Sequence, residues 1–500
     1  MSSGDPAPHG TSANADGLAA LAAARLLPAP RVSPPLDPPF RPAVLARRAL
    51  AAAVEATRAG RTVTLAVEQP GGSVSTRTVR VVPDEHPLAA AGHAICERTA
   101  KTLLWARGGQ RIWVDGPEGV VAALRRRVAD TACGRFDAEL IGVGVYGAPV
   151  EVVAAPAREF PSDRSSSIAL GGHLDGCRVG FDLGASDRKA AAVVDGEVVY
   201  SEEVPWDPVR EADPAWHLDQ IGASLLSAAS HLPRVDAIGG SAAGAYVANE
   251  VRVASLFRAV PREQFDRRVR GIFRELQASW HGIPFEVAND GEVTALAGSM
   301  ASGRGALLGI AMGSSEAAGY VTRGLRLTPW LDELAFVPID FRPDAPRDEW
   351  SGDIGCGVQY LSQQAVGRLL PAAGIELDES ATLPERLVRL QTLMEQGDPR
   401  ATRVYETVGV YLGYALLEYA DWYDIDQVLL LGRVTSGAGG AVINQWARRV
   451  LRTEAPELAA RLAFGEVSER DKRHGQAVAA ASLPIRSPSL STPAPHPEAR

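Results

Sequence analysis

The amino-acid sequence predicts an α/β protein with two similar lobes that face each other across a cleft, preceded by a smaller accessory α/β domain. Three observations support this fold class. The 500 residues allow about three domain-sized units at roughly 100–200 residues each. Apolar runs of strand length alternate with helical patterns over most of the chain. A strand–turn–strand pattern also occurs twice, and internal repeats of this kind define architecture.

Composition and charge narrow the classes of function. Hydrophobic residues make up 46% and charged residues 22% of the chain, which is sufficient for buried cores. The formal net charge is −9, whereas a protein that mainly grips nucleic acid is usually basic, so no nucleic-acid partner is expected. No apolar run approaches the roughly 18 residues of a membrane-spanning helix, so no membrane partner is expected either.

Cysteine usage and the first residues predict a cytoplasmic protein. Four cysteines are too few for a disulfide scaffold, and no two of them form a CxxC pair for structural zinc. Residues 1–14 lack the basic region of a secretory signal.

Both ends of the chain are rich in Pro, Ser and Ala. Residues 1–40 and 487–500 hold little apolar surface to offset the entropy lost on ordering. We therefore predict that both are disordered tails.

Residues 41–170 predict the accessory domain and its linker. The expected strands are 61–69, 75–83, 111–115, 138–147 and 150–156, and the expected helices are 86–106 and 119–132. Arg125, Arg126 and Arg127 are interpreted as a solvated helix face rather than a binding cluster. Residues 156–172 have the composition of a linker.

The internal repeat defines the two lobes, at 171–303 and 304–486. Residues 177–204 predict a strand, a tight turn and two more strands, and residues 305–327 repeat this pattern about 130 residues later. Two such copies facing each other predict the cleft.

The turn of the first copy suits an anion. Asp182 ends a buried strand, and Gly184 and Ser186 would let backbone N–H groups and a hydroxyl approach phosphate, with Lys189 adding a charge. The Asp182 carboxylate would hold Mg²⁺ through water. An ordinary hairpin turn is the alternative interpretation.

The second copy has a similar turn at Gly313, Ser314 and Ser315. Glu316 follows it and would repel phosphate if its side chain pointed into the turn. A third glycine-rich turn follows the buried strand that ends at Gly432, and its position before a helix suits a nucleotide.

Two acidic segments are candidates for substrate chemistry. Asn289 and Asp290 lie between a strand and a helix, at the strand end where α/β sheets bind ligands. Asp290 there would serve as a general base or merely cap the helix. Glu333 lies among apolar residues, so it is either ion-paired or binds ligand.

These segments occur together in an order that resembles the ROK family of repressors, open reading frames and sugar kinases, over residues 178–482. The matching stretches are DLGASDRK, AIGGSAAGAYV, VANDGEVTALAG, LDELAF, SGDIGCGVQYLS, VLLLGRVTSG and RHGQAVAAAS. The resemblance implies two ribonuclease-H-like lobes, use of ATP and Mg²⁺, and a homodimer. It implies Asp290 as the catalytic base, and it places Asn289, Glu333, Ser241 and Gly244 on the sugar.

Several positions depart from the family pattern. Phe336 stands where the family has a zinc-binding histidine, and Ser351 stands where it has a cysteine, so that only Cys356 remains of the zinc loop. No structural zinc is therefore expected. Val358 replaces a second sugar-binding glutamate, and Arg433 replaces a glycine on the adenosine side.

The resemblance and its departures lead to one main hypothesis and two alternatives. The main hypothesis is ATP-dependent phosphorylation of a hydroxyl on a sugar, aminosugar or cyclitol, because the departures make the pocket less polar. The first alternative is a sugar-sensing or regulatory protein that has lost catalysis. The second is a different reaction on a phosphorylated sugar.

Overall fold

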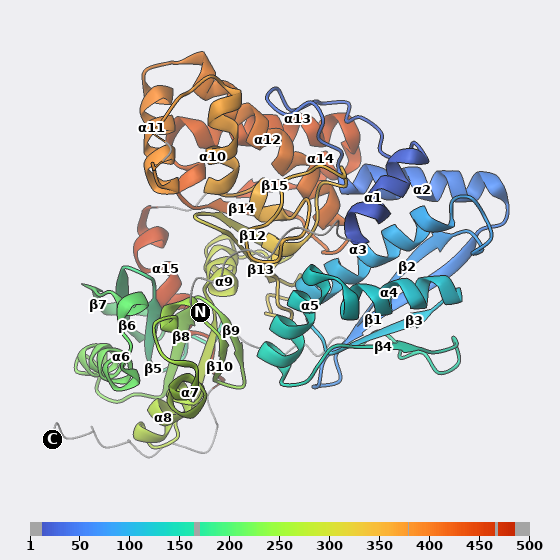
Figure 1. The fold of residues 1–500 in the computed structure, drawn as a ribbon. Helices are drawn as coiled ribbons and strands as arrows, with labels where there is room; N and C mark the ends of the chain where they lie inside the picture. The colour runs from blue at the N-terminus through green and yellow to red at the C-terminus, as the bar shows by residue number, and fades with distance from the viewer. Residues whose placement is uncertain (1–12, 165–170, 379, 466–468, 486–500) are drawn as a thin grey trace.

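A computed structural model describes residues 13–164, 171–378, 380–465 and 469–485. It contains three α/β units, each built on its own main sheet (Figure 1). The accessory domain is coloured blue to cyan, the first lobe green, and the second lobe yellow to red. Within the described ranges, no helix is long and apolar enough to cross a membrane.

The accessory domain contains a four-stranded sheet in the order β2-β1-β3-β4. Its strands are β1 (Arg61–Glu68), β2 (Val74–Val81), β3 (Arg111–Asp115) and β4 (Glu151–Ala154). Its helices are α2 (Ala43–Thr57), α3 (Ala89–Arg107), α4 (Glu118–Asp130) and α5 (Ala132–Asp137). The first three expected strands and both expected helices are confirmed, and β4 confirms the strand expected at 150–156.

The strand expected at 138–147 is wrong. These residues form a π-helix, η1 (Ala138–Tyr146), that continues directly from α5. Ile141 and Val145 are both buried, four positions apart, which is a helical spacing rather than the alternation of a strand. The apolar, β-branched run was misleading because such short runs occur equally in buried helices.

The predicted N-terminal disorder is also wrong for residues 13–40. Helix α1 (Ala13–Ala23) contacts α3, and its Leu18 and Leu21 are fully buried. Residues 1–12 of the predicted tail, and the predicted tail at 487–500, lie outside the described residues.

The segment after α1 is fixed by the second lobe. Phe40 is fully buried, with its ring centroid 5.0 Å from that of Tyr411. The Asp37 carboxylate accepts hydrogen bonds from the Tyr411 hydroxyl at 2.6 Å and from Arg342 at 2.8 Å. Composition could not reveal this order, because its partners lie about 300 residues or more along the chain.

The first lobe has a five-stranded sheet in the order β11-β8-β5-β6-β7. Its strands are β5 (Cys177–Leu183), β6 (Asp187–Val194), β7 (Glu197–Pro205), β8 (Ala237–Ala242) and β11 (Phe285–Asn289). Strands β5, β8 and β11 are parallel, so their carboxyl ends meet at one edge. The helices α6 (Pro214–Ala229) and α8 (Ile272–Ser279) and the hairpin β9 (Ala245–Val247) and β10 (Glu250–Val253) complete the lobe.

The second lobe repeats part of this topology, in the order β13-β12-β14-β15. Its strands are β12 (Leu307–Met312), β13 (Glu316–Val321), β14 (Gln427–Leu431) and β15 (Ala463–Gly465). The antiparallel pair β12–β13 corresponds to β5–β6, and β14 is parallel to β12 as β8 is to β5. Its larger helices are α10 (Gln363–Ala372), α11 (Leu383–Glu395), α12 (Pro399–Ala420) and α13 (Gly437–Glu454).

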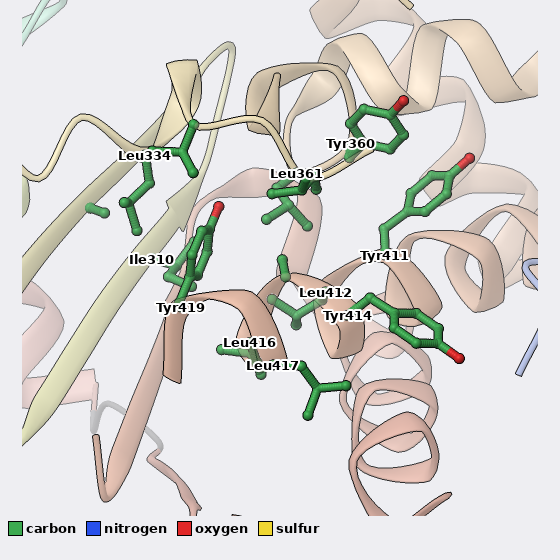
Figure 2. Close-up of a cluster of buried hydrophobic side chains, with 14 of the residues drawn as sticks. Ile310, Leu334, Tyr360, Leu361, Tyr411, Leu412, Tyr414, Leu416, Leu417 and Tyr419 are labelled. Atoms are coloured by element: carbon green, nitrogen blue, oxygen red, sulfur yellow. The ribbon is translucent and has the colours of Figure 1, made fainter. Parts of the chain in front are cut away.

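The largest core cluster joins the second lobe to the accessory domain. Figure 2 shows part of it, where Ile310 of β12, Leu334 and Tyr360 lie beside Tyr411 and Tyr419 of α12. The same cluster includes residues of β1, α3 and α4. The accessory domain is therefore packed into the rest of the molecule rather than appended to it.

Two helices connect the lobes, α9 (Asp290–Ser302) and α15 (Glu469–Ala481). Helix α15 lies so close to β5 and β8 that a Cβ on Gly180 or Gly239 would be 1.9 or 1.7 Å from its carbonyl oxygens. Helix α9 begins at the end of β11 and contacts β12 and β13 of the second lobe. The first turn of α9 is thus held between the two lobes.

Candidate functional site

The sheet register brings the first-lobe candidates together. Leu183, Ala242 and Asn289 are level with one another at the carboxyl ends of β5, β8 and β11. One residue earlier, Asp182 is level with Ser241. Ligands bind at this edge of parallel α/β sheets, so these residues share the edge at which a ligand would lie.

Asp182 is buried at this edge and is held by Ser241. The Ser241 hydroxyl donates to Asp182 Oδ1 at 2.7 Å and accepts from Gln476 of α15 at 3.1 Å. Burial raises the pKa of Asp182 to about 6, although Ser241 and Lys189 favour the charged form. Ser241, which the family resemblance implies is on the sugar, is thus engaged with the carboxylate expected near Mg²⁺.

The first turn is a closed hairpin. The Gly184 N–H donates to the Asp187 carbonyl at 3.0 Å, and the Trp206 indole N–H donates to the Gly184 carbonyl at 2.8 Å. Ser186 and Lys189 both contact the Asp187 carboxylate, at 3.0 and 3.3 Å. Burial would lower the pKa of Lys189, but the nearby carboxylates outweigh it and raise that pKa, so Lys189 remains a cation at this edge.

The turns of the second lobe also meet at one edge. The Gly313 N–H donates to the Ser315 carbonyl at 2.9 Å, while the side chains of Ser314 and Ser315 are exposed. Gly432 has φ 90° and lies so close to β12 that a Cβ on it would be 2.5 Å from the Met312 carbonyl oxygen. Only glycine suits that position.

Glu316 does not point into the phosphate turn. It is buried in the second lobe, where its Oε1 accepts a hydrogen bond from the Tyr419 hydroxyl at 3.0 Å. Burial raises its pKa to about 8, so the side chain is largely neutral at pH 7. Glu316 is therefore not expected to repel phosphate at this turn. The Arg433 side chain is exposed.

A Glu316→Gln variant tests this assignment. Folding raises the pKa of Glu316 from 4.5 to about 8, so the native state holds a proton that the unfolded state releases across that window. The wild-type protein therefore loses stability as pH rises from about 5 to about 8, and the neutral variant lacks this contribution. Urea midpoints should shift in favour of the variant over this range. The exposed control Glu457→Gln should not shift, and parallel profiles for Glu316→Gln and the wild type would contradict the assignment.

Asn289 is the N-cap residue of α9, and Asp290 accepts from the same backbone N–H. The Asn289 Oδ1 accepts from the Gly291 N–H at 2.8 Å, its Nδ2 donates to the Gly244 carbonyl at 2.8 Å, and Glu292 completes a capping box. The Asp290 carboxylate accepts from the Gly291 N–H at 2.9 Å. Burial raises the pKa of Asp290. Asn289 therefore takes the capping role and also fixes the loop at Gly244.

Glu333 is buried close enough to Asp290 for the two carboxylates to influence each other. Burial, together with the nearby carboxylates of Asp290 and Asp332, raises its pKa to about 7. Among the described residues, no cation forms an ion pair with Glu333. Of the two roles predicted for it, ligand binding is therefore the one that the described contacts leave open.

Two further carboxylates in this region were not predicted as site residues. Burial raises the pKa of Glu292 well above its ordinary value, and Asp332 and Glu333 add to the effect. Burial raises the pKa of Asp332 to about 6, and Asp332 accepts a hydrogen bond from Tyr423 at 2.8 Å. The capping-box spacing from Asn289 to Glu292 was readable in the sequence, whereas the position of Asp332 depends on tertiary packing.

The residues fit a Mg²⁺ ion better than a zinc ion. Mg²⁺ binds one or two carboxylates and keeps several of its waters. Asp182 can provide such a carboxylate. Burial raises the pKa of Cys356 to about 12, which disfavours the thiolate that zinc requires. Phe336 is stacked on Trp105, and the Ser351 hydroxyl donates to Asp348 at 2.6 Å. In the ranges that the structure covers, no three His, Cys, Asp or Glu side chains form a metal-binding group.

Comparison with known proteins supports the fold. No protein-family model and no curated protein matches the chain. A ROK family transcriptional regulator, a homologue of the E. coli Mlc protein, is 20% identical with a TM-score of 0.50 over 62% of this chain and 79% of its own. A ROK hexokinase from Thermus thermophilus is 23% identical with a TM-score of 0.47, over 61% of this chain and 97% of its own. A Streptomyces griseus ROK glucokinase, solved with glucose and AMPPNP, is 20% identical with a TM-score of 0.46 over 61% and 98%. The two lobes of this chain therefore have the fold of the ROK family.

Proposed function

We propose that the protein transfers the γ-phosphate of ATP to a hydroxyl of a sugar, aminosugar or cyclitol, with Asp290 as the general base. The observation that carries the proposal is the position of Asp290. It is the first residue of α9, at the edge where parallel strands end, and Asn289 rather than Asp290 is the N-cap residue. Burial raises its pKa toward the range of a working base.

The proposed mechanism uses side chains already in place. Asp290 accepts the proton of the substrate hydroxyl as that oxygen attacks the γ-phosphorus, and ADP leaves. Glu333 accepts hydrogen bonds from other hydroxyls and orients the ring, while Asn289 fixes the loop at Gly244. Phosphoryl transfer depends chiefly on such positioning and on charge neutralisation.

The phosphates of ATP would lie between the two hairpin turns. Lys189 supplies positive charge near Asp182, and the exposed hydroxyls of Ser314 and Ser315 supply donors from the other lobe. Mg²⁺, when bound through water to Asp182, would neutralise charge on the phosphates. Gly432 lets the end of β14 lie close to β12, on the side where the ROK resemblance implies the adenosine.

The acceptor site is expected to offer fewer polar contacts than a site for an ordinary hexose. Val358 is buried with Ala335 and Cys356 in a small apolar cluster, against which Phe336 packs. A carboxylate at position 358 would have offered two further acceptors to a sugar. An aminosugar or a cyclitol that presents fewer hydroxyls toward position 358 would suit this change.

The pH dependence of turnover follows from the raised pKa of the base. An Asp in water titrates near 3.9, so an unperturbed base would give a flat profile above about pH 5. Because burial raises the pKa of Asp290 and brings that of Glu333 to about 7, kcat/KM should rise with pH between about 5 and 7.5. Steady-state rates of ADP release across this range provide the measurement. A flat profile would contradict the requirement that both carboxylates be charged for turnover.

One structural observation favours a second candidate function. The N–H groups of Gly184 and Gly313 both donate within their own turns, so they are not free to hold phosphate in this conformation. A sugar-binding regulatory protein that has lost phosphoryl transfer would have this feature. It predicts binding of sugars without binding of nucleotide.

The experiment that tests the proposed function is a screen for ADP release. Hexoses, aminosugars and cyclitols are offered with Mg²⁺ and ATP, and release is compared with the rate without acceptor. An acceptor that raises ADP release at least tenfold supports the kinase. Nucleotide binding without any acceptor-dependent release would support a different reaction, and loss of nucleotide binding would support the sensor.

A further inference from the structure

The accessory domain is bonded directly to the segment that carries Glu333. The Glu333 N–H donates to the Trp105 carbonyl at 3.1 Å, and the Asp332 N–H donates to the Ala106 carbonyl at 3.2 Å. These carbonyls belong to the last turn of α3, which has no intrahelical donors for them. The end of α3 therefore sets the backbone position of both carboxylate residues.

An aromatic stack fixes the other side of this segment. The Phe336 ring lies 4.0 Å from the Trp105 ring at an interplanar angle of 22°, and Phe136 packs against both. The Trp105 indole N–H donates to Asp137 at 2.9 Å, which holds the ring in place.

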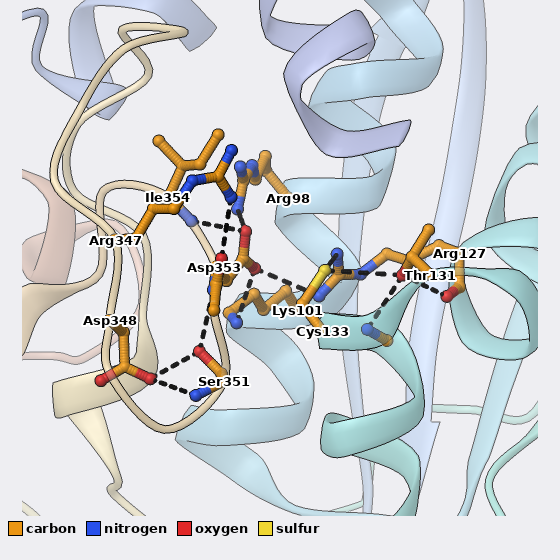
Figure 3. Close-up of polar contacts among 12 residues, drawn as sticks. Arg98, Lys101, Arg127, Thr131, Cys133, Arg347, Asp348, Ser351, Asp353 and Ile354 are labelled. Carbon is orange, nitrogen blue, oxygen red and sulfur yellow. Dashed lines mark hydrogen bonds and ion pairs between the residues drawn. The ribbon is translucent and has the colours of Figure 1, made fainter. Parts of the chain in front are cut away.

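A buried network of charges adjoins the stack through Asp137, and Figure 3 shows its contacts around Asp353. Asp353 contacts Lys101 at 2.7 Å, Arg98 at 2.9 Å and Arg127 at 3.4 Å. Asp137 pairs with Arg127 and, at 3.5 Å, with Lys101. All five side chains are at most 5% exposed.

The network joins three helices of the accessory domain to one loop of the second lobe. Arg98 and Lys101 lie on α3, Arg127 on α4 and Asp137 on α5, while Asp353 belongs to the loop. Burial alone would raise the pKa of Asp353, but the three cations hold it well below its ordinary value. Arg127, which was predicted to face solvent with its two neighbours, is thus the buried member of that run.

The Asp353 loop is bonded in turn to the residues that follow Glu333. The Ile339 N–H donates to the Gly355 carbonyl at 2.8 Å, and the Gly357 N–H donates to the Val337 carbonyl at 2.9 Å. The segment that begins at Glu333 is therefore fixed by α3 at one end and by the Asp353 loop at the other. Helix α3 is part of the accessory domain, and the Asp353 loop is ion-paired to that domain.

We propose that the accessory domain is needed to form the substrate site. Its helix α3 and the buried charges of Arg98, Lys101 and Arg127 position Glu333. The inference rests on the proposed function only for the role of Glu333 as a substrate ligand. These residues are positioning residues that act through the Asp353 loop and the Phe336 stack. The Asp353 loop is the one in which the ROK resemblance implies a bound zinc, and Phe336, Ser351 and the buried Cys356 do not fit that metal.

Amide hydrogen exchange over residues 331–337 tests the proposal. Arg127→Gln removes one of three cations and leaves Lys101 and Arg98 paired with the two carboxylates. The exchange rate of the 331–337 amides should rise at least tenfold, while the amides of β5 exchange as in the wild type. Arg126→Gln is the matched control, because Arg126 is the exposed neighbour on the same helix. Arg127→Lys, which retains the charge, should restore slow exchange.

Phe336→Leu provides a second variant that leaves no buried charge unpaired. It removes the stack on Trp105, and the same segment should again exchange at least tenfold faster. If Arg127→Gln does not fold, this variant decides. Wild-type exchange over 331–337 in the folded variants, or in Phe336→Leu alone, would overturn the proposal.

Turnover distinguishes positioning from a general loss of structure. With D-glucosamine as the acceptor, a displaced Glu333 should raise KM at least tenfold and lower kcat less, and the Kd for Mg·ATP should stay unchanged. Equal losses in kcat and in ATP binding would overturn a role specific to Glu333. If the wild type transfers no phosphate to any acceptor, the proposed function fails, and the exchange rates still decide the positioning.

Discussion

An Asp290→Asn variant is expected to lower kcat for acceptor-dependent ADP release by about 100- to 10,000-fold, the range that a general base contributes. The amide cannot accept the hydroxyl proton at the moment of attack. The side chain accepts from the Gly291 N–H at 2.9 Å, and the amide oxygen of Asn preserves that bond. Steady-state kinetics and circular dichroism of the purified variant provide the measurement.

The control for this variant is Glu286→Gln, which neutralises a half-buried carboxylate in β11, the strand that leads into α9. It should retain near-wild-type kcat, and both variants should unfold near the wild-type temperature. Retention of most of the activity by Asp290→Asn would show that Asp290 is not the base. A fall in both variants would point to disturbance of β11 instead.

An Asp353→Ala variant is expected to lower the free energy of unfolding by about 3–5 kcal/mol, the usual cost of removing one partner from a buried charge pair. The substitution leaves Arg98, Lys101 and Arg127 buried with Asp137 as the remaining carboxylate of the network. The three cations remain shielded from water, and no new contact replaces the one that each made with Asp353. Urea unfolding at neutral pH gives the measurement.

The matched control is Asp344→Ala, whose carboxylate pairs with Arg342 but is 82% exposed. An exposed pair contributes at most about 1 kcal/mol, so this variant should unfold near the wild-type midpoint. A loss below about 1 kcal/mol in Asp353→Ala would show that the network does not hold the accessory domain to the second lobe. It would also remove the energetic basis for the positioning of Glu333.

The internal repeat was sufficient to predict the two lobes. The small-residue turns at Gly184 and Gly313 follow equivalent strands, β5 and β12, and each next parallel strand lies on the same side. The position of Asp290 was also predictable, because a strand that ends in Asn289 places the next residue at the ligand-binding edge. Local pattern fixes such features without knowledge of tertiary packing.

Other features depend on partners far along the chain. Asp37 and Phe40 are ordered by the second lobe, and the composition of their own segment carries no sign of it. Arg127 looks like Arg125 and Arg126 in sequence, yet it alone is buried, because Asp353 lies beside it in space. Buried charge networks of this kind cannot be predicted from spacing.

The direction of a side chain was the least predictable feature of the site. Glu316 follows the second turn directly, and only the structure shows that it turns toward Tyr419 and away from the phosphate side. Ser241 lies in the stretch that the ROK resemblance places at the sugar, but its hydroxyl faces Asp182. In both cases the sequence indicates the strand on which the residue lies and leaves its partner undetermined.

The central claim, that this fold still transfers phosphate, is tested most directly by calorimetric titration of the full-length chain with Mg·ATP, followed by ADP release with the acceptor panel. The account predicts binding of Mg·ATP and acceptor-dependent release of ADP that is lost in Asp290→Asn. No binding of Mg·ATP, with or without the candidate acceptors, would contradict it. The closed turns at Gly184 and Gly313 would then mark a protein that binds its sugar without phosphorylating it.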